Sequence, residues 1–211
     1  MPVVDNTGFA WVHLGGLPSL RCLRTHDGAV LRIHLHRPHR LNALNKEMLR
    51  DLGLVFEALA TPQGAEVRAV VIAGDGKGFC SGADLKAATG GDGPEHAWDS
   101  RLIHNQRAFS RLVAKIRACP QLVVAAINGP CVGGGFAMAL ACDVRFARSD
   151  AVLYGNFPQL GLSACELGVS HTLPRLVGIG RTLLPRWHVA DTAPALACCL
   201  QTCVSLHCDS V

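Results

Sequence analysis

The spacing of apolar residues in the first half of the chain predicts two strands with a helix between them. Residues 29–38 alternate between apolar and polar side chains, which is typical of a strand with one wet face, and Pro38 would end it. Residues 45–60 repeat apolar side chains three and four positions apart, which predicts an amphipathic helix with Asn45 as its N-cap. Residues 67–74 are continuously apolar, as expected of a strand buried on both faces.

The second half of the chain repeats this alternation. A linker with few apolar residues, 86–99, leads into a second long amphipathic helix. Residues 122–129 predict another buried strand, which runs through three glycines into a helix over 134–142. Further along, residues 166–178 predict a helix that Pro174 would kink or break. Strands that alternate with helices predict an α/β fold with parallel strands and right-handed crossovers.

The composition favours one folded domain with a sizeable core. The chain has 211 residues, of which 49% are apolar and 17% are charged. The formal net charge of +4 is mild, so it suits a small anionic ligand better than a nucleic-acid surface, where clustered basic residues are expected. The apolar run over residues 122–142 has about the length that spans a bilayer, but Asn-Gly-Pro at 128–130 interrupts it. We therefore expect neither a membrane segment nor a nucleic-acid partner.

The cysteines and histidines match no metal-binding template in the sequence. The chain has ten cysteines but no CxxC pair, and several lie in apolar segments where a reduced thiol packs as a small buried side chain. His34, His36 and His39 lie close together, but no carboxylate or cysteine accompanies them, which favours solvated histidines. We therefore expect no metal site.

The N-terminus gives little information about the compartment. It lacks the charged-then-apolar order of a secretory signal. We expect a cytoplasmic protein, and Arg21 and Arg24, preceded by the single acid Asp5, keep a mitochondrial address open as the alternative.

Residues 128–143, NGPCVGGGFAMALACD, place three consecutive glycines at the junction of a predicted strand and a predicted helix. Amides in the first turn of a helix lack intrahelical acceptors, and the helix dipole makes that end partly positive. Because glycine has no side chain, a ligand atom could reach these amides directly, which favours a receptor for an anion or an oxyanion. The glycines could instead be structural and allow close packing of helix on strand. The pattern lacks a Walker lysine and is not GxGxxG, which argues against a phosphate cradle.

A second glycine-bearing loop, Gly82-Ala83-Asp84, follows the other buried strand. In a parallel sheet both loops leave the carboxyl ends of the strands, where ligands bind. Amides from two loops can therefore converge on one oxygen as an oxyanion hole, in which losing one donor costs about 3 kcal/mol of transition-state stabilisation. We expect Asp84 to hold this loop in place.

Four segments of the chain together resemble one family. They are RPHRLNALN (37–45), GDGKGFCSGADL (74–85), VVAAINGPCVGGGFAMALACD (123–143) and GLSACELGVSHTLPRLVG (161–178). In this order they are similar to the crotonase superfamily, the enoyl-CoA hydratases and isomerases. The resemblance implies an α/β fold with a crotonase-like ββα spiral core over residues 27–181, an N-terminal extension over 1–26 and an atypical cysteine-rich tail over 182–211.

The resemblance implies a function on acyl-CoA thioesters, with no cofactor other than the coenzyme A that is part of the substrate. The amides of Ala83 and Gly134 would polarise the thioester carbonyl and stabilise an enolate. The residues implied to hold the substrate and its CoA part are Arg37, Arg40, Leu41, Asn42, Ala43, Ser81, Gly82, Asp84, Lys86 and Gly133. For the three basic residues among them, a solvated surface is the alternative interpretation.

A proton acceptor is also needed, because an oxyanion hole moves no proton. Typical hydratases of this family carry two glutamates, but the matching positions here hold Ala137 and Phe157, which cannot transfer a proton. Glu166 is the remaining carboxylate in this region and is the candidate acid/base. Its alternative interpretation is a first-turn helix residue that the dipole favours.

The end of the chain departs from the family. Relatives usually continue after the segment that 161–178 matches with helices that cover the acyl pocket and build a trimer, and from about Leu183 this chain does not resemble them. We therefore expect the trimerisation helices to be largely missing, with a homotrimer or hexamer if the altered end permits it. The first functional hypothesis is an enoyl-CoA hydratase or isomerase. The second is a non-catalytic variant that binds acyl-CoA or a partner, and the mild charge disfavours an RNA-binding relative.

Overall fold

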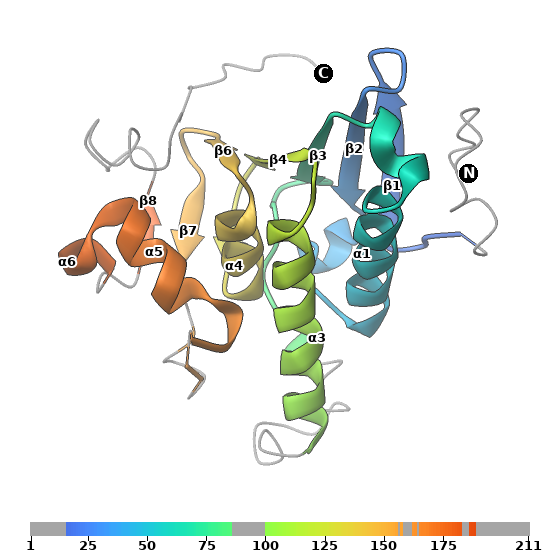
Figure 1. Cartoon of the computed structure of the whole chain (residues 1–211). Helices are drawn as coiled ribbons and strands as arrows, with labels where there is room; N and C mark the ends of the chain where they lie inside the picture. The colour runs from blue at the N-terminus through green and yellow to red at the C-terminus, as the bar shows by residue number, and fades with distance from the viewer. Residues whose placement is uncertain are drawn as a thin grey trace.

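The described strands form two sheets. The computed structural model describes residues 16–85, 100–155, 157, 162–163, 165–182 and 186–188. The larger sheet has the order β1-β2-β3-β4-β6, with β1 Leu20–Thr25, β2 Val30–Leu35, β3 Ala69–Gly74, β4 Leu122–Ile127 and β6 Val144–Ala147 (Figure 1). The smaller sheet has the order β5-β7-β8, with β5 Cys131–Val132, β7 Val152–Tyr154 and β8 Arg186–His188. The helices are α1 Lys46–Leu59, α3 Ser100–Arg117, α4 Gly134–Ala141, α5 Val169–Val177 and α6 Ile179–Thr182, with 3-10 helices η2 Pro38–Arg40, η3 Pro62–Glu66 and η6 Cys165–Leu167.

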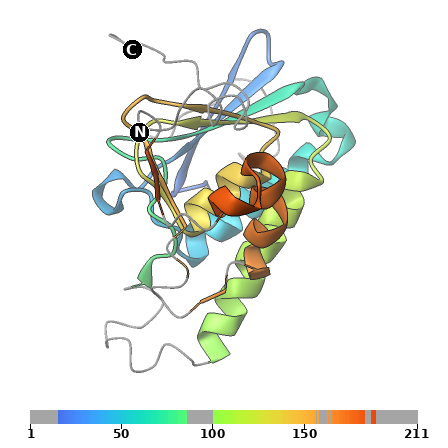
Figure 2. The same ribbon diagram turned by 90° about the vertical axis from the view of Figure 1, so that its left-hand side faces the viewer.

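One face of the five-stranded sheet carries the core. Helices α1, α3 and α4 lie on the same side of this sheet (Figure 2). The register sets Ile33 of β2 beside Ile72 of β3, and Ile72 beside Ala125 of β4. All three side chains are buried, so a register slip of one residue would turn the whole row away from the helices.

Strands β2, β3, β4 and β6 run parallel, as the alternation of strands and helices predicted. Strand β1 joins the edge of the sheet antiparallel to β2 through a tight turn in which His26, Asp27 and Gly28 have positive φ. The segment predicted as an N-terminal extension, residues 1–26, thus contains an edge strand of the sheet. Its sequence gave no clear strand signal because β1 is only partly buried and lacks the regular alternation of β2.

The main helices follow the predicted periodicity. Helix α1 has the predicted N-cap, since the side chain of Asn45 accepts a hydrogen bond from the Met48 amide at 2.9 Å. Helix α5 contains Pro174 in its interior without ending there. It begins at Val169, three residues later than predicted, because Gly168 has a φ of +71° and the residues before it form η6.

Most of the predicted tail, residues 182–211, lies outside the described residues, so its missing trimerisation helices remain a prediction. Residues Arg186–His188 are described, and they form β8, which pairs antiparallel with β7. The apolar run over 122–142 folds as β4, β5 and α4. Among the helices that the structure describes, none has the length and apolarity needed to cross a membrane.

Candidate active site

Three loops meet beyond the carboxyl ends of β2, β3 and β4. The loop after β2 donates from the Leu44 amide to the Gly82 carbonyl at 2.7 Å and accepts at the Leu41 carbonyl from the Ser81 amide at 2.9 Å. The loop after β4 joins them through the Val132 amide, which donates to the Cys80 carbonyl at 2.9 Å. The three loops are therefore joined by their main chains, as the parallel sheet predicted.

Each of the three consecutive glycines at the start of α4 has its own environment. Gly133 has a φ of +50°, and a Cβ there would meet nothing within 4 Å. A Cβ at Gly134 would lie 2.8 Å from the Phe109 ring, and one at Gly135 would lie 2.6 Å from the Cβ and the carbonyl oxygen of Cys80. Close packing thus accounts for Gly134 and Gly135, whereas Gly133 supplies a positive φ and borders open space.

The loop after β3 touches the start of α4. Gly82 has a φ of +90°, and a Cβ at this position would lie 3.3 Å from the Gly134 nitrogen and 2.8 Å from the Val132 carbonyl oxygen. Within the described part of the chain, the amides of Ala83 and Gly134 donate no hydrogen bond to another protein group. The amide of Ala83 directly follows Gly82, so two unpaired donors belong to neighbouring segments. Such donors can bind an anion or a polarised carbonyl oxygen.

Two of the predicted CoA-binding side chains support these loops from within. Asn42 is fully buried, and its Nδ2 donates to the carbonyls of Asp75 and Gly78 at 2.9 and 2.8 Å. Its Oδ1 accepts from the Arg37 amide at 2.9 Å. The Arg37 guanidinium lies 2.9 Å from the Asp84 carboxylate, and these side chains are only 15% and 9% exposed. Asp84 thus anchors the loop that presents Ala83, as predicted, and Arg37 is committed to it.

The remaining predicted binding residues differ in exposure. Arg40 and Leu41 are exposed beside the loops, whereas Ala43 is buried. Ser81 is partly buried, and its hydroxyl donates to the Arg40 carbonyl at 3.2 Å. Lys86 lies outside the described residues.

The structure describes the backbone of Glu166, the candidate acid/base, but not its side chain. Ala137 and Phe157, which match the usual glutamate positions, are buried apolar residues. Glu166 lies in η6, and its side chain lies outside the described part of the structure. Helix α3 contacts both η6 and α4, so the Glu166 backbone and the glycine loop border the same helix. The role of Glu166 stays a prediction.

A carboxylate that the sequence analysis missed accompanies two of the clustered histidines. The carboxylate of Asp75 lies 3.1 Å from Nδ1 of His34 and 2.7 Å from Nδ1 of His36, and Arg21 lies 3.3 Å away. The signal was available in the strand pairing, because His34 pairs with Ala73 and this places Asp75 next to His36. Over the residues with described side chains, no group of three or more histidine, cysteine or acidic residues has an arrangement that could hold a metal ion.

The thiols beside the glycines are unreactive at neutral pH. Cys80 and Cys131 are fully buried where their segments pair. Burial raises the pKa of Cys80 to about 12 and that of Cys131 well above its ordinary value. Both thiols are therefore protonated at neutral pH, which argues against a role as nucleophiles.

Known proteins match the region that holds this site. Residues 25–182 match the family model described as enoyl-CoA hydratase/isomerase. The chain is 39% identical over 153 residues, 72% of its length, to the "Probable enoyl-CoA hydratase echA12" of Mycobacterium leprae. It is 34% identical over 156 residues, 71% of its length, to the mitochondrial Delta(3,5)-Delta(2,4)-dienoyl-CoA isomerase of Mus musculus. The chain spans about half the length of these relatives, 51% of the first and 46% of the second.

Solved structures confirm the crotonase-like α/β fold expected from the sequence. An enoyl-CoA hydratase from Bacillus anthracis superposes with a TM-score of 0.70 at 30% identity, over 78% of this chain and 60% of that chain. A protein classed as an enoyl-CoA hydratase from Thermobifida fusca, solved in complex with acetoacetyl-CoA, superposes with a TM-score of 0.65 at 33% identity, over 79% of this chain and 65% of that chain.

Proposed function

This chain belongs to the enoyl-CoA hydratase/isomerase family, and we propose that it binds a CoA thioester with the thioester carbonyl oxygen between the amides of Ala83 and Gly134. The observation that supports this most is the close approach of the two loops, since a Cβ added at Gly82 would lie 3.3 Å from the Gly134 nitrogen, with both donor amides unpaired among the described residues. A side chain at Gly82 would overlap the Val132 carbonyl oxygen, so its absence is what lets the two segments come together.

The two amides would act on charge that develops during the reaction. When a base removes a proton next to the thioester carbonyl, the electron pair moves to the carbonyl oxygen and forms an enolate. Donors that are already fixed by the loops stabilise this negative oxygen without reorganisation, and each contributes about 3 kcal/mol. The buried Arg37–Asp84 pair and Asn42 would hold the donors in place.

A single acid/base suits proton transfer between two carbons better than hydration. Hydration in the usual way needs two carboxylates, and the buried residues Ala137 and Phe157 occupy their positions. We propose that Glu166 accepts the proton from one carbon and returns it to another, which would shift the double bond. The dienoyl-CoA isomerase among the relatives is consistent with this reaction class.

The CoA part would meet basic residues at the loop edge. Arg37 is already paired with Asp84, which leaves the exposed Arg40, together with Lys86, as the proposed phosphate contacts. The Thermobifida fusca relative solved with acetoacetyl-CoA supports a ligand of this class. A trimer or hexamer is also proposed, and the molar mass in solution by light scattering would test it.

A second candidate function is binding without turnover, and the same two apolar positions favour it. A protein that holds the thioester oxygen but lacks the proton acceptor would bind acyl-CoA as a sensor or as a subunit of a larger enzyme.

The test combines binding and turnover. Binding of acetoacetyl-CoA is measured by calorimetry, and turnover is measured with 2-enoyl-CoA and 3-enoyl-CoA substrates, for the wild type and for Glu166→Gln and Ala83→Pro. The proline removes the donor N–H, so we expect turnover to fall about 100-fold or more, with circular dichroism as the folding control. Binding without turnover in the wild type would favour the second function. No binding of any CoA thioester by the folded wild type would reject both.

A further inference from the structure

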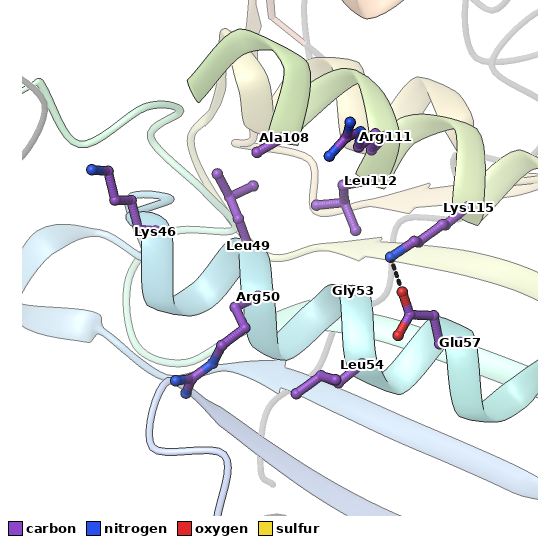
Figure 3. A pocket seen from close by; sticks show the side chains of 10 residues that line it. All are labelled: Lys46, Leu49, Arg50, Gly53, Leu54, Glu57, Ala108, Arg111, Leu112 and Lys115. Atoms are coloured by element: carbon purple, nitrogen blue, oxygen red, sulfur yellow. Dashed lines mark hydrogen bonds and ion pairs between the residues drawn. The ribbon is translucent and has the colours of Figure 1, made fainter. Parts of the chain in front are cut away.

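A groove of about 340 Å³ lies between α1 and α3, and none of its lining residues belongs to the loops around Gly134 (Figure 3). It follows α1 from Lys46 to Glu57, a distance of about 16 Å at 1.5 Å per helical residue. A volume near 300 Å³ is at the lower end of the range for small-molecule sites, so the groove suits a slender ligand.

The floor of the groove is apolar and is kept open by small residues. Leu49 of α1 and Ala108 and Leu112 of α3 face one another between the helices (Figure 3). Gly53 lies about one helical turn after Leu49 on α1. A glycine in a helix interior costs about 1 kcal/mol of stability relative to alanine. A Cβ there would meet only Lys115 Nζ, at 3.2 Å. The absence of a side chain at Gly53 therefore leaves the room in which the Lys115 ammonium reaches Glu57, and a methyl group there would force Lys115 to move.

The rim of the groove carries an excess of positive charge. Its cations are Lys46, Arg50, Arg111 and Lys115, and its one acid is Glu57. Lys115 pairs with Glu57 at 2.6 Å, and Arg50 pairs with the buried Asp51 at 2.7 Å. Over the described residues, Lys46 and Arg111 have no ion pair or hydrogen bond, and both are exposed. Two cations are thus available to a ligand in the groove.

We propose that this groove binds an amphiphilic anion, a carboxylate or phosphate head group on one short apolar chain. The chain would lie on Leu49 and Leu112, and the head group would pair with Arg111, since a charge-assisted hydrogen bond needs a donor that no protein carboxylate already occupies. This site is separate from the proposed thioester site and does not depend on it.

The test is a titration of the whole chain with octanoate and with octyl phosphate, followed by amide chemical shifts. Octanol and inorganic phosphate serve as controls that carry only the chain or only the charge. We expect both amphiphiles to shift amides of residues 46–57 and 108–115 with saturation, and both controls to shift them far less. The two amphiphiles distinguish a carboxylate ligand from a phosphate ligand by their relative affinities.

Matched variants test whether octanoate binds in the groove. Arg111→Gln should weaken octanoate binding about tenfold, the value of one charge-assisted contact. Arg107→Gln makes the same charge change on an exposed residue of α3 that does not line the groove, and it should leave the affinity unchanged. Gly53→Ala should also weaken binding, because the methyl group takes up part of the groove and Lys115 must shift, while the thermal midpoint stays equal or higher because alanine favours a helix interior.

Three outcomes would overturn the proposal. The first is equal binding of octanol and octanoate, which would remove the role of charge. The second is equal loss in Arg111→Gln and Arg107→Gln. The third is octanoate shifts confined to the loops around Gly134 that acetoacetyl-CoA displaces, which would assign the anion to the proposed thioester site.

Discussion

At the scale of single residues, neighbouring glycines differ in what the fold requires of them. Gly133 needs its positive φ, whereas Gly135 needs its missing side chain, because Cys80 occupies the space a methyl group would take. Gly134 lies between these cases, since its nearest neighbour is the edge of an aromatic ring that can move. The fold therefore requires each of the three consecutive glycines for a different structural reason.

This difference predicts a graded effect on stability. Gly135→Ala should lower the free energy of unfolding by about 1–3 kcal/mol, because the new methyl group would overlap backbone as well as side-chain atoms of Cys80. Gly133→Ala should cost about 1–3 kcal/mol from backbone strain alone, because a φ of +50° with a ψ of −114° is a conformation that L-residues rarely adopt. Gly180→Ala is the control, since a Cβ there meets nothing within 4 Å. Urea unfolding measures all three, and a Gly135→Ala protein as stable as the control would contradict the close approach.

The ion pair between Arg37 and Asp84 predicts a coupled pair of mutations. Arg37→Met and Asp84→Asn should each lower the free energy of unfolding by about 1–3 kcal/mol, because each leaves a largely buried partner uncompensated. The double variant should lose less than the sum of the two. The exposed pair Arg148–Asp150 is the matched control, and its cycle should show little coupling. Additive losses for Arg37 and Asp84 would contradict a structural role for the pair.

At the scale of elements, the start of α1 depends on one side chain. Asn45→Ala should lower the free energy of unfolding by about 1 kcal/mol, since the Met48 amide would lose its acceptor. Asn45→Asp should retain most of the stability, because a carboxylate accepts the same hydrogen bond and favours the positive end of the helix. Chemical denaturation monitored by circular dichroism measures both, and equal losses in the two variants would argue against capping.

The elements that the sequence predicted best are those whose pattern is set by burial. Strands β3 and β4 were recognised from their continuous apolar runs, although only alternate residues of each are fully buried and the predicted burial on both faces was wrong, and α1 shows a clear stripe because one side faces the sheet. Strand β1 was missed because an edge strand is stabilised by pairing with its neighbour, and pairing leaves no periodic signal in its own residues. The start of α5 was misplaced because the positive φ of Gly168 is a tertiary outcome.

At the scale of the whole molecule, buried thiols connect stability to pH. Burial raises the pKa of Cys80 and of Cys142 from 9.0 to about 12. Between about pH 9 and pH 12 the unfolded chain has lost these two thiol protons, whereas the folded chain retains them. The folded state therefore binds more protons than the unfolded state in this range. Stability should therefore be constant below about pH 9 with respect to these groups and fall as pH rises toward 12, by about 1.4 kcal/mol per pH unit for each thiol.

The comparison of variants isolates the contribution of one thiol. Cys142→Ala should flatten the alkaline slope of unfolding free energy against pH, whereas Cys165→Ala should not, because Cys165 is exposed. A reducing agent is present throughout so that only ionisation is followed. Parallel slopes for both variants and the wild type would show that Cys142 ionises freely in the folded chain.

The location of the two glycine loops was predictable from the sequence, whereas the roles of their residues stay predictions. The two glycine loops were located correctly because carboxyl ends of parallel strands meet at one edge of a sheet. The partners of Arg37 and Asp75 were not predictable, because they depend on loop paths and on the register between strands that are far apart in sequence. An exposed basic residue and a paired one look the same in a sequence.

The dependence of the loops on Asn42 also bears on how this protein can evolve. The loop that carries Ala83 is held from the side of β2 and β3, through buried contacts that tolerate little variation. Helix α3, η6 and α5 form the other flank and share none of these hydrogen bonds. Under the proposed function, selection for a new acyl group would act on η6 and α5, while the loop that carries Ala83 keeps its supports beside β2 and β3.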